Sequence, residues 1–444
     1  MQMNIMKYLF YCITFTAISL YVYTYSSQKA VINVAVADLI GNPIATIRPN
    51  EQTENAYHTI ALCGVQTNSA FACPRMHQLL YNDIVEIIKI HNDEAYIHAP
   101  HAFYVSSSSP TPSSFAPLSH KASEDYRKAS ENKHSHYWTL KKNITLLDDI
   151  INNKISINHL PEQIDFTHAN KNTLDNSDIV TLQKPHYDST LKITFSVGTR
   201  FVKVPTTKKQ SHSLEVFAID YKKMREYRIK IPRKKCMLIN ENQTTSERIT
   251  NYVTVLKKWA HAKPGCIPYI WGGTSFTHTT QGSFKEVTQK TNNSDYSFYQ
   301  YEKDTASPKS GFDCSGVILR AAQICGIPYF CKNTATIPHS LKPLQPNQQL
   351  ANGDLILVRG HVMVVSDITR NMLIEARAYA HGYGKLQEIP INEVFDDIKT
   401  YDDLCNAYRD KKIVKRKDKQ GKVRDSFANL QLLSMASIWD TQNL

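Results

Sequence analysis

Short runs of alternating apolar and polar residues dominate the first half of the chain. VINVAVADL, residues 31–39, and RMHQLLYNDIVEIIKIHNDEAYIHA, residues 75–99, alternate in stretches that Asn and Asp interrupt. A period of two residues is typical of strands with one buried face, and Asn and Asp favour the turns between strands. The pattern predicts a small β barrel within residues 30–110.

A second strand-rich region follows a polar stretch. Residues 105–140 are rich in Ser, His, Lys and Pro, so we expect 111–185 to be a linker and irregular segment, with helices around LLDDIINNKI and NSDIVTL. LKITFSVGTRFVKV, HSLEVFAIDY and REYRIKIPR then alternate again, with basic residues on the outward face. These strands predict a second small β barrel at residues 186–240.

The last region, residues 241–444, starts with a helical pattern. SERITNYVTVLKKWAHAK, residues 246–263, has apolar residues at helical spacing, and Pro264 and Gly265 end it. GFDCSGVILRAAQICGI opens a second helix that Gly326 ends, and GDLILVRGHVMVVSD and NMLIEARA predict consecutive strands. Helices followed by a strand meander indicate an α+β domain.

Residues 8–25 form an uncharged apolar run, YLFYCITFTAISLYVYTY, between Lys7 and the polar SSQK. At about 1.5 Å per residue, a helix of this length just spans the hydrocarbon core of a bilayer. Residues 1–29 are therefore predicted to be a signal peptide or membrane anchor, with a buried core helix as the alternative. A signal peptide or a membrane anchor would place the rest of the chain outside the inner membrane, in the cell envelope.

Length and charge narrow the class of protein. A chain of 444 residues is too long for one hydrophobic core. The net charge of +12 is spread along the chain, and its one dense run, KKIVKRKDKQGKVR at 411–424, indicates a solvated loop or hairpin. No RNA-binding signature, zinc-finger spacing or phosphate loop accompanies the charge, which argues against nucleic acid as a partner.

Nine cysteines are too few for a disulfide scaffold in a chain of this length. Cys63 with Cys73, and Cys325 with Cys331, are close enough in sequence to form disulfides in an oxidising compartment. No pair has the C-x-x-C spacing of a redox motif or zinc site.

Cys314, within GFDCSG, is the candidate nucleophile. A helix that begins at Asp313 or Cys314 puts its positive end at the sulfur, and the N–H groups of Cys314 and Ser315 are among its unpaired donors. A thiol reacts as thiolate, so such a setting favours catalysis. Taken alone, the stretch fits a structural cysteine at a helix start equally well.

His361 and Glu375 supply the other groups that a cysteine nucleophile needs. His361 follows Gly360 at the start of an apolar strand, where its imidazole is presented at the strand edge. Glu375 is an acid inside an apolar run of the next strand, which is costly to bury without a partner. We expect it to orient the ring of His361, the alternative being an outward-facing strand residue.

The order Y-x-W-G-G, D-C-S-G at a helix start, G-D-L, G-H-V and I-E-A resembles the NlpC family of bacterial cell-wall cysteine peptidases over residues 246–400. The resemblance implies a papain-like core with Cys314 as nucleophile, His361 as base and Glu375 as orienting group. Two preceding β modules are similar to the SH3-like pair of three-domain γ-D-glutamyl-L-diamino acid endopeptidases.

The resemblance also implies residues that border bound substrate. Tyr269 matches a tyrosine beside the nucleophile, and Trp271 with its two glycines is expected mainly to pack and turn. Asp313 corresponds to an acid that in some relatives receives the free amino end of the substrate, or it caps the helix. Ser315 and Gly360 flank the two catalytic groups. The insert at 277–310, which the family pattern lacks, either covers the cleft or is a surface loop.

The function implied is hydrolysis of peptidoglycan stem peptides, at the bond between the γ-carboxyl of D-Glu and a diamino acid. No metal or organic cofactor is required for such a reaction. The alternatives are a non-catalytic wall-binding protein, which the intact Cys and His argue against, and an amidase or acyltransferase on the same core. A lowered pKa of the Cys314 thiol is expected for the enzyme.

Overall fold

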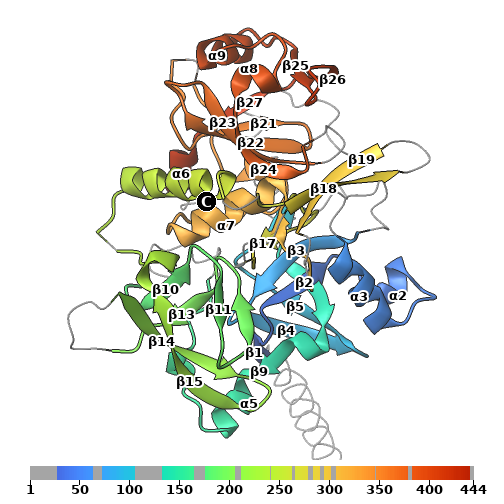
Figure 1. Cartoon of the computed structure of the whole chain (residues 1–444), viewed down its shortest axis with the longest axis vertical. Helices are drawn as coiled ribbons and strands as arrows, with labels where there is room; N and C mark the ends of the chain where they lie inside the picture. Colours follow the sequence, from blue (N-terminus) through green and yellow to red (C-terminus); the bar gives the residue numbers. More distant parts are fainter. Residues whose placement is uncertain are drawn as a thin grey trace, which may run out of the picture.

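The computed structural model arranges the chain as two β parts below a larger α+β part, with helix α7 between them (Figure 1). It describes residues 28–63, 73–105, 133–164, 176–205, 212–240, 242–262, 266–278, 284–290, 295–301, 307–345, 347–378 and 383–440. The backbone alone is described for the two strands at 284–290 and 295–301.

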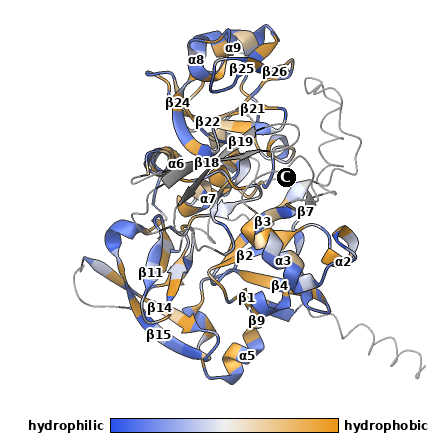
Figure 2. Cartoon of the chain, turned by 45° about the vertical axis from the view of Figure 1, so that its right-hand side comes forward, coloured by the Kyte–Doolittle hydropathy of each residue, from blue (hydrophilic) through white to orange (hydrophobic). Residues whose placement is uncertain are grey.

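The first part is one antiparallel sheet of seven strands in the order β3-β2-β8-β5-β4-β1-β9. β2 is buried along all five residues and is largely hydrophobic in Figure 2. Helices α2 and α3 pack their apolar residues on one end of the sheet. The bounds are β1 Gln28–Ile32, β2 Val36–Ile40, α2 Ile44–Ile47, α3 Thr53–Leu62, β3 Arg75–Leu80, β4 Ile84–His91, β5 Glu94–His98, β6 Tyr104–Val105, β7 Lys133–His134, β8 His136–Leu140 and β9 Ile144–Leu146.

The second part consists of three small antiparallel sheets, β13-β10-β16, β11-β12 and β14-β15. Their apolar side chains form one core with α5, and Tyr81 of the first part joins that core and accepts a hydrogen bond from Ile219 N at 2.8 Å. The bounds are α5 Leu147–Asn152, β10 Ile179–Leu182, β11 His186–Asp188, β12 Ile193–Phe195, β13 Arg200–Val202, β14 Ser213–Asp220, β15 Arg225–Pro232 and β16 Cys236–Met237.

The third part has a five-stranded antiparallel sheet, β24-β23-β22-β21-β27, between two layers of helices. Helices α6 and α7 share a core with one face of the sheet, and α8 and α9 share a core with the other. The bounds are α6 Thr245–Ala260, α7 Cys314–Ile324, β21 Leu355–Val358, β22 His361–Asp367, β23 Met372–Arg377, β24 Lys385–Pro390, α8 Ile391–Val394, α9 Tyr401–Arg409 and β27 Gln431–Leu433.

Three short strand pairs complete this part. β17 (Thr274–Ser275) pairs with β20 (Gly311–Phe312), and β18 (Phe284–Lys290) pairs with β19 (Asp295–Tyr301) inside the 277–310 insert. β25 (Val414–Lys417) and β26 (Val423–Phe427) form a hairpin. The basic run at 411–424 is therefore a hairpin, as its composition indicated.

Most elements of the third part agree with the sequence pattern, while one predicted helix of the second part is wrong. Thr244 and Glu247 form the capping box of α6. The N-cap residue, Thr244, lies two residues before the predicted start of the helix. NSDIVTL, predicted as a helix, contains β10, whose β-branched residues are buried between β13 and β16. LLDDIINNKI contains α5, as predicted.

The predicted linker at 111–185 differs from the structure, because part of it belongs to the sheets. β8 lies between β2 and β5, β9 pairs with β1, and β10 is the central strand of the second part's largest sheet. These strands pair with partners that are distant in sequence, and a polar stretch precedes them. Their place in the sheets therefore could not be read from the local pattern. The likeness of the two parts to SH3 domains stays a prediction.

The predicted leader, residues 1–29, lies outside the described residues except for the first two residues of β1. Among the helices that the structure describes, none is long and apolar enough to cross a bilayer.

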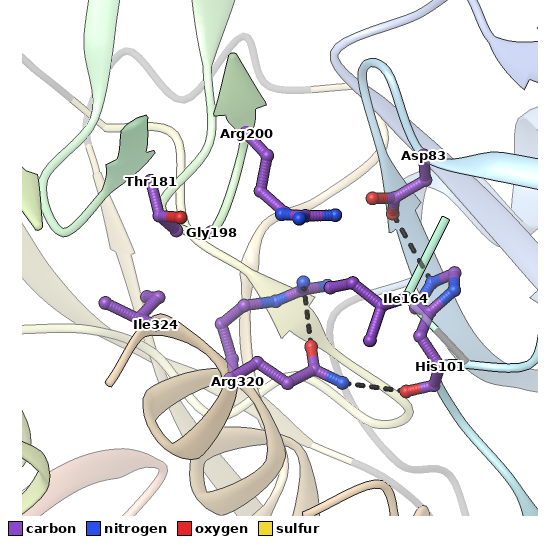
Figure 3. Close-up of a pocket in the computed structure, with 9 residues that line it drawn as sticks. Asp83, His101, Ile164, Thr181, Gly198, Arg200, Arg320 and Ile324 are labelled. Carbon is purple, nitrogen blue, oxygen red and sulfur yellow. Dashed lines mark hydrogen bonds and ion pairs between the residues drawn. The ribbon is translucent and has the colours of Figure 1, made fainter. Parts of the chain in front are cut away.

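All three parts meet at a buried polar junction (Figure 3). Arg320 of α7 donates to Thr274 O at 2.9 Å and to Gln78 O of the first part at 3.3 Å. Gln323, one turn further along α7, donates to His101 O at 2.7 Å. Gly198 of the second part has φ +86°, and a Cβ there would lie 2.3 Å from Arg320 Cδ. The junction thus fixes the C-terminal half of α7 against both β parts.

Candidate active site

Cys314 is the first residue of α7, and Asp313 caps that helix. Asp313 Oδ1 accepts hydrogen bonds from Gly316 N at 2.5 Å and from Ser315 Oγ at 3.0 Å. A carboxylate at this position satisfies helix donors that would otherwise be unpaired, and it favours the positive end of the helix dipole. The cap fixes the direction in which α7 presents Cys314.

Gly316 brings α7 close to the Trp-Gly-Gly turn. A Cβ at Gly316 would lie 2.1 Å from Gly273 O, and Asp313 N donates to the same carbonyl oxygen at 3.1 Å. The glycine is therefore required by the close approach of this turn to the start of α7.

The thiol of Cys314 lies next to the start of β22. Its sulfur accepts hydrogen bonds from the backbone N–H groups of Val362 and Ser315. Val362 directly follows His361, so α7 and the β21–β22 hairpin bring the nucleophile candidate and the histidine candidate together. The two residues are 47 positions apart in the chain, and each keeps a small exposed fraction, 9% for Cys314 and 7% for His361.

The expected lowering of the Cys314 pKa is wrong for this structure. Burial, and then the charge of Asp313, raise the pKa of the thiol to about 12, against the donors at the sulfur and the ammonium of Lys332. The helix end supplies donors, but a nearly enclosed sulfur next to a carboxylate disfavours the anion. The resting sulfur is therefore a thiol at neutral pH.

His361 and Glu375 form a buried pair across β22 and β23. His361 Nε2 lies 2.8 Å from Glu375 Oε2, and the exposed fraction of Glu375 is 1%. Burial lowers the pKa of His361, although the hydrogen bond with Glu375 opposes the change. Burial would raise the pKa of Glu375, but Arg377 and His361 hold it at about 2. Glu375 is thus an anion that fixes Nε2, leaving Nδ1 as the nitrogen available for proton transfer.

Two neighbours that the sequence reasoning missed hold Glu375 in place. Gln387 Nε2 donates to Glu375 Oε1 at 3.2 Å, and Arg377 Nη1 lies 3.6 Å from the same oxygen. Arg377 is two residues after Glu375 on β23, so both side chains lie on one face of the sheet. Gln387 is the cross-strand partner of Glu375 in β24. The two-residue period of a strand could have placed Arg377 beside Glu375 from the sequence. The position of Gln387 depends on the register between β23 and β24, which the sequence does not give.

Lys332 is a third group that the sequence reasoning missed. Its Nζ lies 2.5 Å from Asp313 Oδ2 and 3.4 Å from Ser315 Oγ, and its exposed fraction is 2%. The ammonium neutralises the carboxylate beside Cys314 and favours the thiolate. Asp313 is therefore occupied as a helix cap and ion-pair partner. No feature around Lys332 in the sequence pointed to this role.

The remaining predicted residues are at the edges of the site. Tyr269 is buried, and its backbone forms a bridge with Phe312, directly before the Asp313 cap. Trp271 packs partly buried against the core, and its carbonyl accepts from Arg75 at 3.3 Å. Gly360 has φ +74° in the turn between β21 and β22, and no atom lies within 4 Å of a Cβ built there, so backbone conformation alone explains the glycine.

Ser315 is used structurally. Its hydroxyl donates to Asp313 and accepts from Asn333 N at 3.2 Å, while its N–H donates to the Cys314 sulfur. Within the described ranges, no three His, Cys, Asp or Glu side chains form a group that would hold a metal ion.

No protein-family model matches the chain, and no curated protein matches it. Among solved structures, it is similar to an NlpC/P60 family protein from Bacillus cereus ATCC 10987, with 14% identity, 82% of this chain and 95% of that chain covered, and a TM-score of 0.44. It is also similar to NlpC2 from Trichomonas vaginalis, with 8% identity, 83% and 94% covered, and a TM-score of 0.29.

A third similar structure is the peptidoglycan hydrolase RipB from Mycobacterium tuberculosis, with 24% identity, 34% of this chain and 68% of that chain covered, and a TM-score of 0.21. Each TM-score is below 0.5, so the site has to be judged by its own geometry. These similar structures are named as an NlpC/P60 family protein, an NlpC protein and a peptidoglycan hydrolase.

Proposed function

We propose that the protein is a cysteine peptidase that hydrolyses peptidoglycan stem peptides. The observation that carries the proposal is the convergence of Cys314, the His361–Val362 strand start and Glu375 from three separate elements. A thiol, an imidazole and a carboxylate in this order are the groups that acyl transfer through a covalent intermediate needs.

The resting site is neutral in the proposed mechanism. The thiol pKa of about 12 and the lowered pKa of His361 make an imidazole beside a thiol the dominant form at neutral pH. His361 then takes the thiol proton as the sulfur attacks the substrate carbonyl, so general-base catalysis replaces a preformed ion pair. Glu375, whose pKa is about 2, remains an anion and stabilises the imidazolium that forms.

The first turn of α7 supplies the donor for the developing oxyanion. Ser315 N donates to the sulfur and Gly316 N to the Asp313 cap, which leaves the N–H of Cys314 for a substrate oxygen. His361 next protonates the leaving amine, and the carbon–nitrogen bond breaks to leave a thioester on Cys314. Water, deprotonated by His361, hydrolyses the thioester and restores the thiol.

The proposed scissile bond joins the γ-carboxyl of D-Glu to a diamino acid, and Tyr269 and Trp271 are the proposed substrate-side residues. Asp313, Ser315 and Gly360 have structural roles instead. The proposed location is the cell envelope, with residues 8–25 as an export signal or anchor. The name of the similar RipB structure, a peptidoglycan hydrolase, agrees with a wall substrate.

A non-catalytic wall-binding protein is the second candidate. The specific observation in its favour is the raised thiol pKa, since an activated cysteine is expected to have a lowered one. The two candidates differ in whether a bond is broken.

Mass analysis of defined stem peptides after incubation with the full chain tests the proposal. We expect two fragments from cleavage at the γ-D-Glu bond, whose masses add up to the mass of the substrate plus one water. We expect none with Cys314→Ala, which removes only the sulfur at the first residue of α7. Cys325→Ala, a buried cysteine at the other end of the same helix, is the control for folding. Equal turnover by Cys314→Ala would reject the mechanism, and intact substrate with wild-type protein would favour the wall-binding candidate.

A further inference from the structure

The first part of the molecule contains two cysteines, Cys63 and Cys73, that lie side by side at Arg75. Cys63 is the C-cap of α3, and Cys73 lies two residues before the start of β3. Their side chains are in hydrogen-bond contact, and Cys73 is a free thiol. Cys63 is partly exposed, whereas the exposed fraction of Cys73 is 2%. One sulfur of the pair is therefore reachable from solvent, and the other lies behind it.

Arg75 holds the two cysteine-bearing segments together. Its Nη1 donates to Cys63 O at 2.7 Å and lies 4.0 Å from Cys73 Sγ, and its Nη2 donates to Ile60 O at 2.6 Å. Asp38 binds the same guanidinium twice, at 2.7 and 3.1 Å. A bidentate pair of this kind is geometrically specific, and it places a cation at the C-terminal end of α3. The sulfurs are thus held in contact by a rigid, buried network.

The same network gives the pair thiolate character. The hydrogen bond with Cys63 and the charge of Arg75 lower the pKa of Cys73, although burial opposes them, and the contact raises the pKa of Cys63. Of the two sulfurs, Cys73 is therefore the one at which the anion is favoured. Burial raises the pKa of the other described cysteines for which a shift is resolved, namely Cys236, Cys266, Cys314, Cys325 and Cys405.

We propose that Cys63 and Cys73 form a redox site that closes reversibly to a disulfide, with a small-molecule or protein disulfide as the oxidant. The partly exposed Cys63 thiol gives its proton to Cys73 as its sulfur attacks one sulfur of the oxidant, and Cys73 passes that proton to the first thiolate leaving group. The Cys73 thiolate then attacks Cys63 and releases the second. The two thiols lose two protons and two electrons, and the oxidant is reduced to two thiols.

The site adjoins the third part of the molecule. Arg75 Nη1 also lies 3.3 Å from Trp271 O, and a Cβ at Gly272 would lie 2.3 Å from Arg75 O. Ala61, two residues before Cys63, accepts a hydrogen bond from Lys309 N at 2.7 Å. Oxidation replaces the two thiols by a neutral disulfide, and Arg75 keeps Asp38 as its anionic partner. The covalent link then ties the end of α3 to the segment before β3, next to the contact between Arg75 and the Trp-Gly-Gly turn.

Peptide mapping of the folded full chain tests the proposal. The protein is incubated with oxidised glutathione, remaining thiols are blocked with iodoacetamide, and the digest is weighed. We expect a Cys63–Cys73 cross-linked peptide, lighter by two hydrogen atoms than the sum of its reduced parts, which dithiothreitol converts back. The pair should close roughly tenfold faster than Cys405 forms a glutathione adduct, because thiolate fraction sets the rate of exchange.

Two variants sharpen the result. Cys73→Ser should leave Cys63 as a stable glutathione adduct, and Cys405→Ser, which removes a partly exposed cysteine on α9, should leave the cross-link unchanged. A wild-type map in which Cys63 carries glutathione while Cys73 is alkylated would overturn the proposal. So would a map in which both stay reduced while Cys405 is modified. The readout is a mass, so neither result depends on whether the chain cleaves stem peptides.

Discussion

Cys314 and Cys73 are both buried sulfurs near the end of a helix, and their surroundings shift their pKa values in opposite directions. Cys314 has the positive helix end and two N–H donors, yet burial and the Asp313 carboxylate outweigh them. Cys73 lies beside a guanidinium and a second thiol, which outweigh its burial. The difference teaches that the balance between burial and the charged or donating partners of a sulfur sets the direction of its pKa shift.

The largest expected effect is that of removing His361, the proposed base for Cys314. The proposed reaction of Cys73 uses no such base. His361→Ala should reduce kcat/KM for stem peptides by roughly 10³-fold, the usual size of general-base catalysis. The reaction of Cys63 and Cys73 with oxidised glutathione should not change, since His361 belongs to another part of the chain. Steady-state kinetics and peptide mapping of the same preparation check both statements, and a variant with near-normal turnover would remove His361 from the mechanism.

Removal of the charge on Glu375 should have the next largest effect. Glu375→Gln keeps the shape but removes the anion, so we expect kcat/KM to fall roughly 10–100-fold, as for other orienting partners. Glu375 raises the pKa of His361, so the acid limb of the pH profile should move to lower pH. Glu388→Gln on β24, whose carboxylate pairs with Ser366 and His261, is the matched control. An acid limb that stays in place would contradict the assigned pairing.

Substitution of Lys332, the ion-pair partner of Asp313, should widen the difference between the pKa values of Cys314 and Cys73. Lys332→Met should raise the pKa of Cys314 further and slow its alkylation about tenfold, the effect of one pKa unit. Breaking a buried ion pair also destabilises the fold, so the double variant Lys332→Met with Asp313→Asn should regain stability, because Asn also caps helices. Alkylation measured by peptide mapping and thermal unfolding separate the two effects. Faster alkylation of Cys314 in Lys332→Met would contradict the electrostatic role.

Substitution of Arg75 tests how a neighbouring cation affects the pKa of Cys73. Arg75→Met should raise the pKa of Cys73 and slow closure of the disulfide several-fold, whereas alkylation of Cys314 stays unchanged. Arg75→Lys keeps the charge but loses the bidentate geometry, and should give an intermediate rate. Time courses with oxidised glutathione measure the difference. Equal rates in all three proteins would mean that Cys63 alone sets the reactivity of the pair.

The smallest expected effect is on stability in acid. Glu375 has a folded pKa of about 2 against an ordinary 4.5, so its contribution is complete above about pH 4.5 and is lost as pH falls towards 2. The pKa of His361 is also lowered, so its contribution shrinks as pH falls below its ordinary value of 6.5. Both signs predict a falling Tm on acidification, less steep in Glu375→Gln. A steeper fall in that variant would contradict the assigned charge state.

The sequence predicts the elements that carry Cys314, His361 and Glu375, because each has a local signature. A capped helix start, a glycine turn before an apolar strand and a lone acid in that strand's neighbour are all short-range patterns. Lys332 and Gln387 were missed because they reach the site through tertiary packing and strand register. The sign of the Cys314 shift was wrong for the same reason, since enclosure of the sulfur is not a property of the stretch GFDCSG.

The polar junction at the base of α7 has a consequence for anyone who cuts this chain into pieces. Arg320 donates to Gln78 O and Gln323 donates to His101 O, so a fragment starting at residue 241 would lose one acceptor of Arg320 and the backbone acceptor of Gln323. Cys314, the proposed nucleophile, is at the start of the same helix, 10 residues before its last residue. Replacing either β part with an unrelated domain would therefore remove contacts that hold α7, and with it Cys314, in position. A chimaera would have to keep the residues of this polar junction.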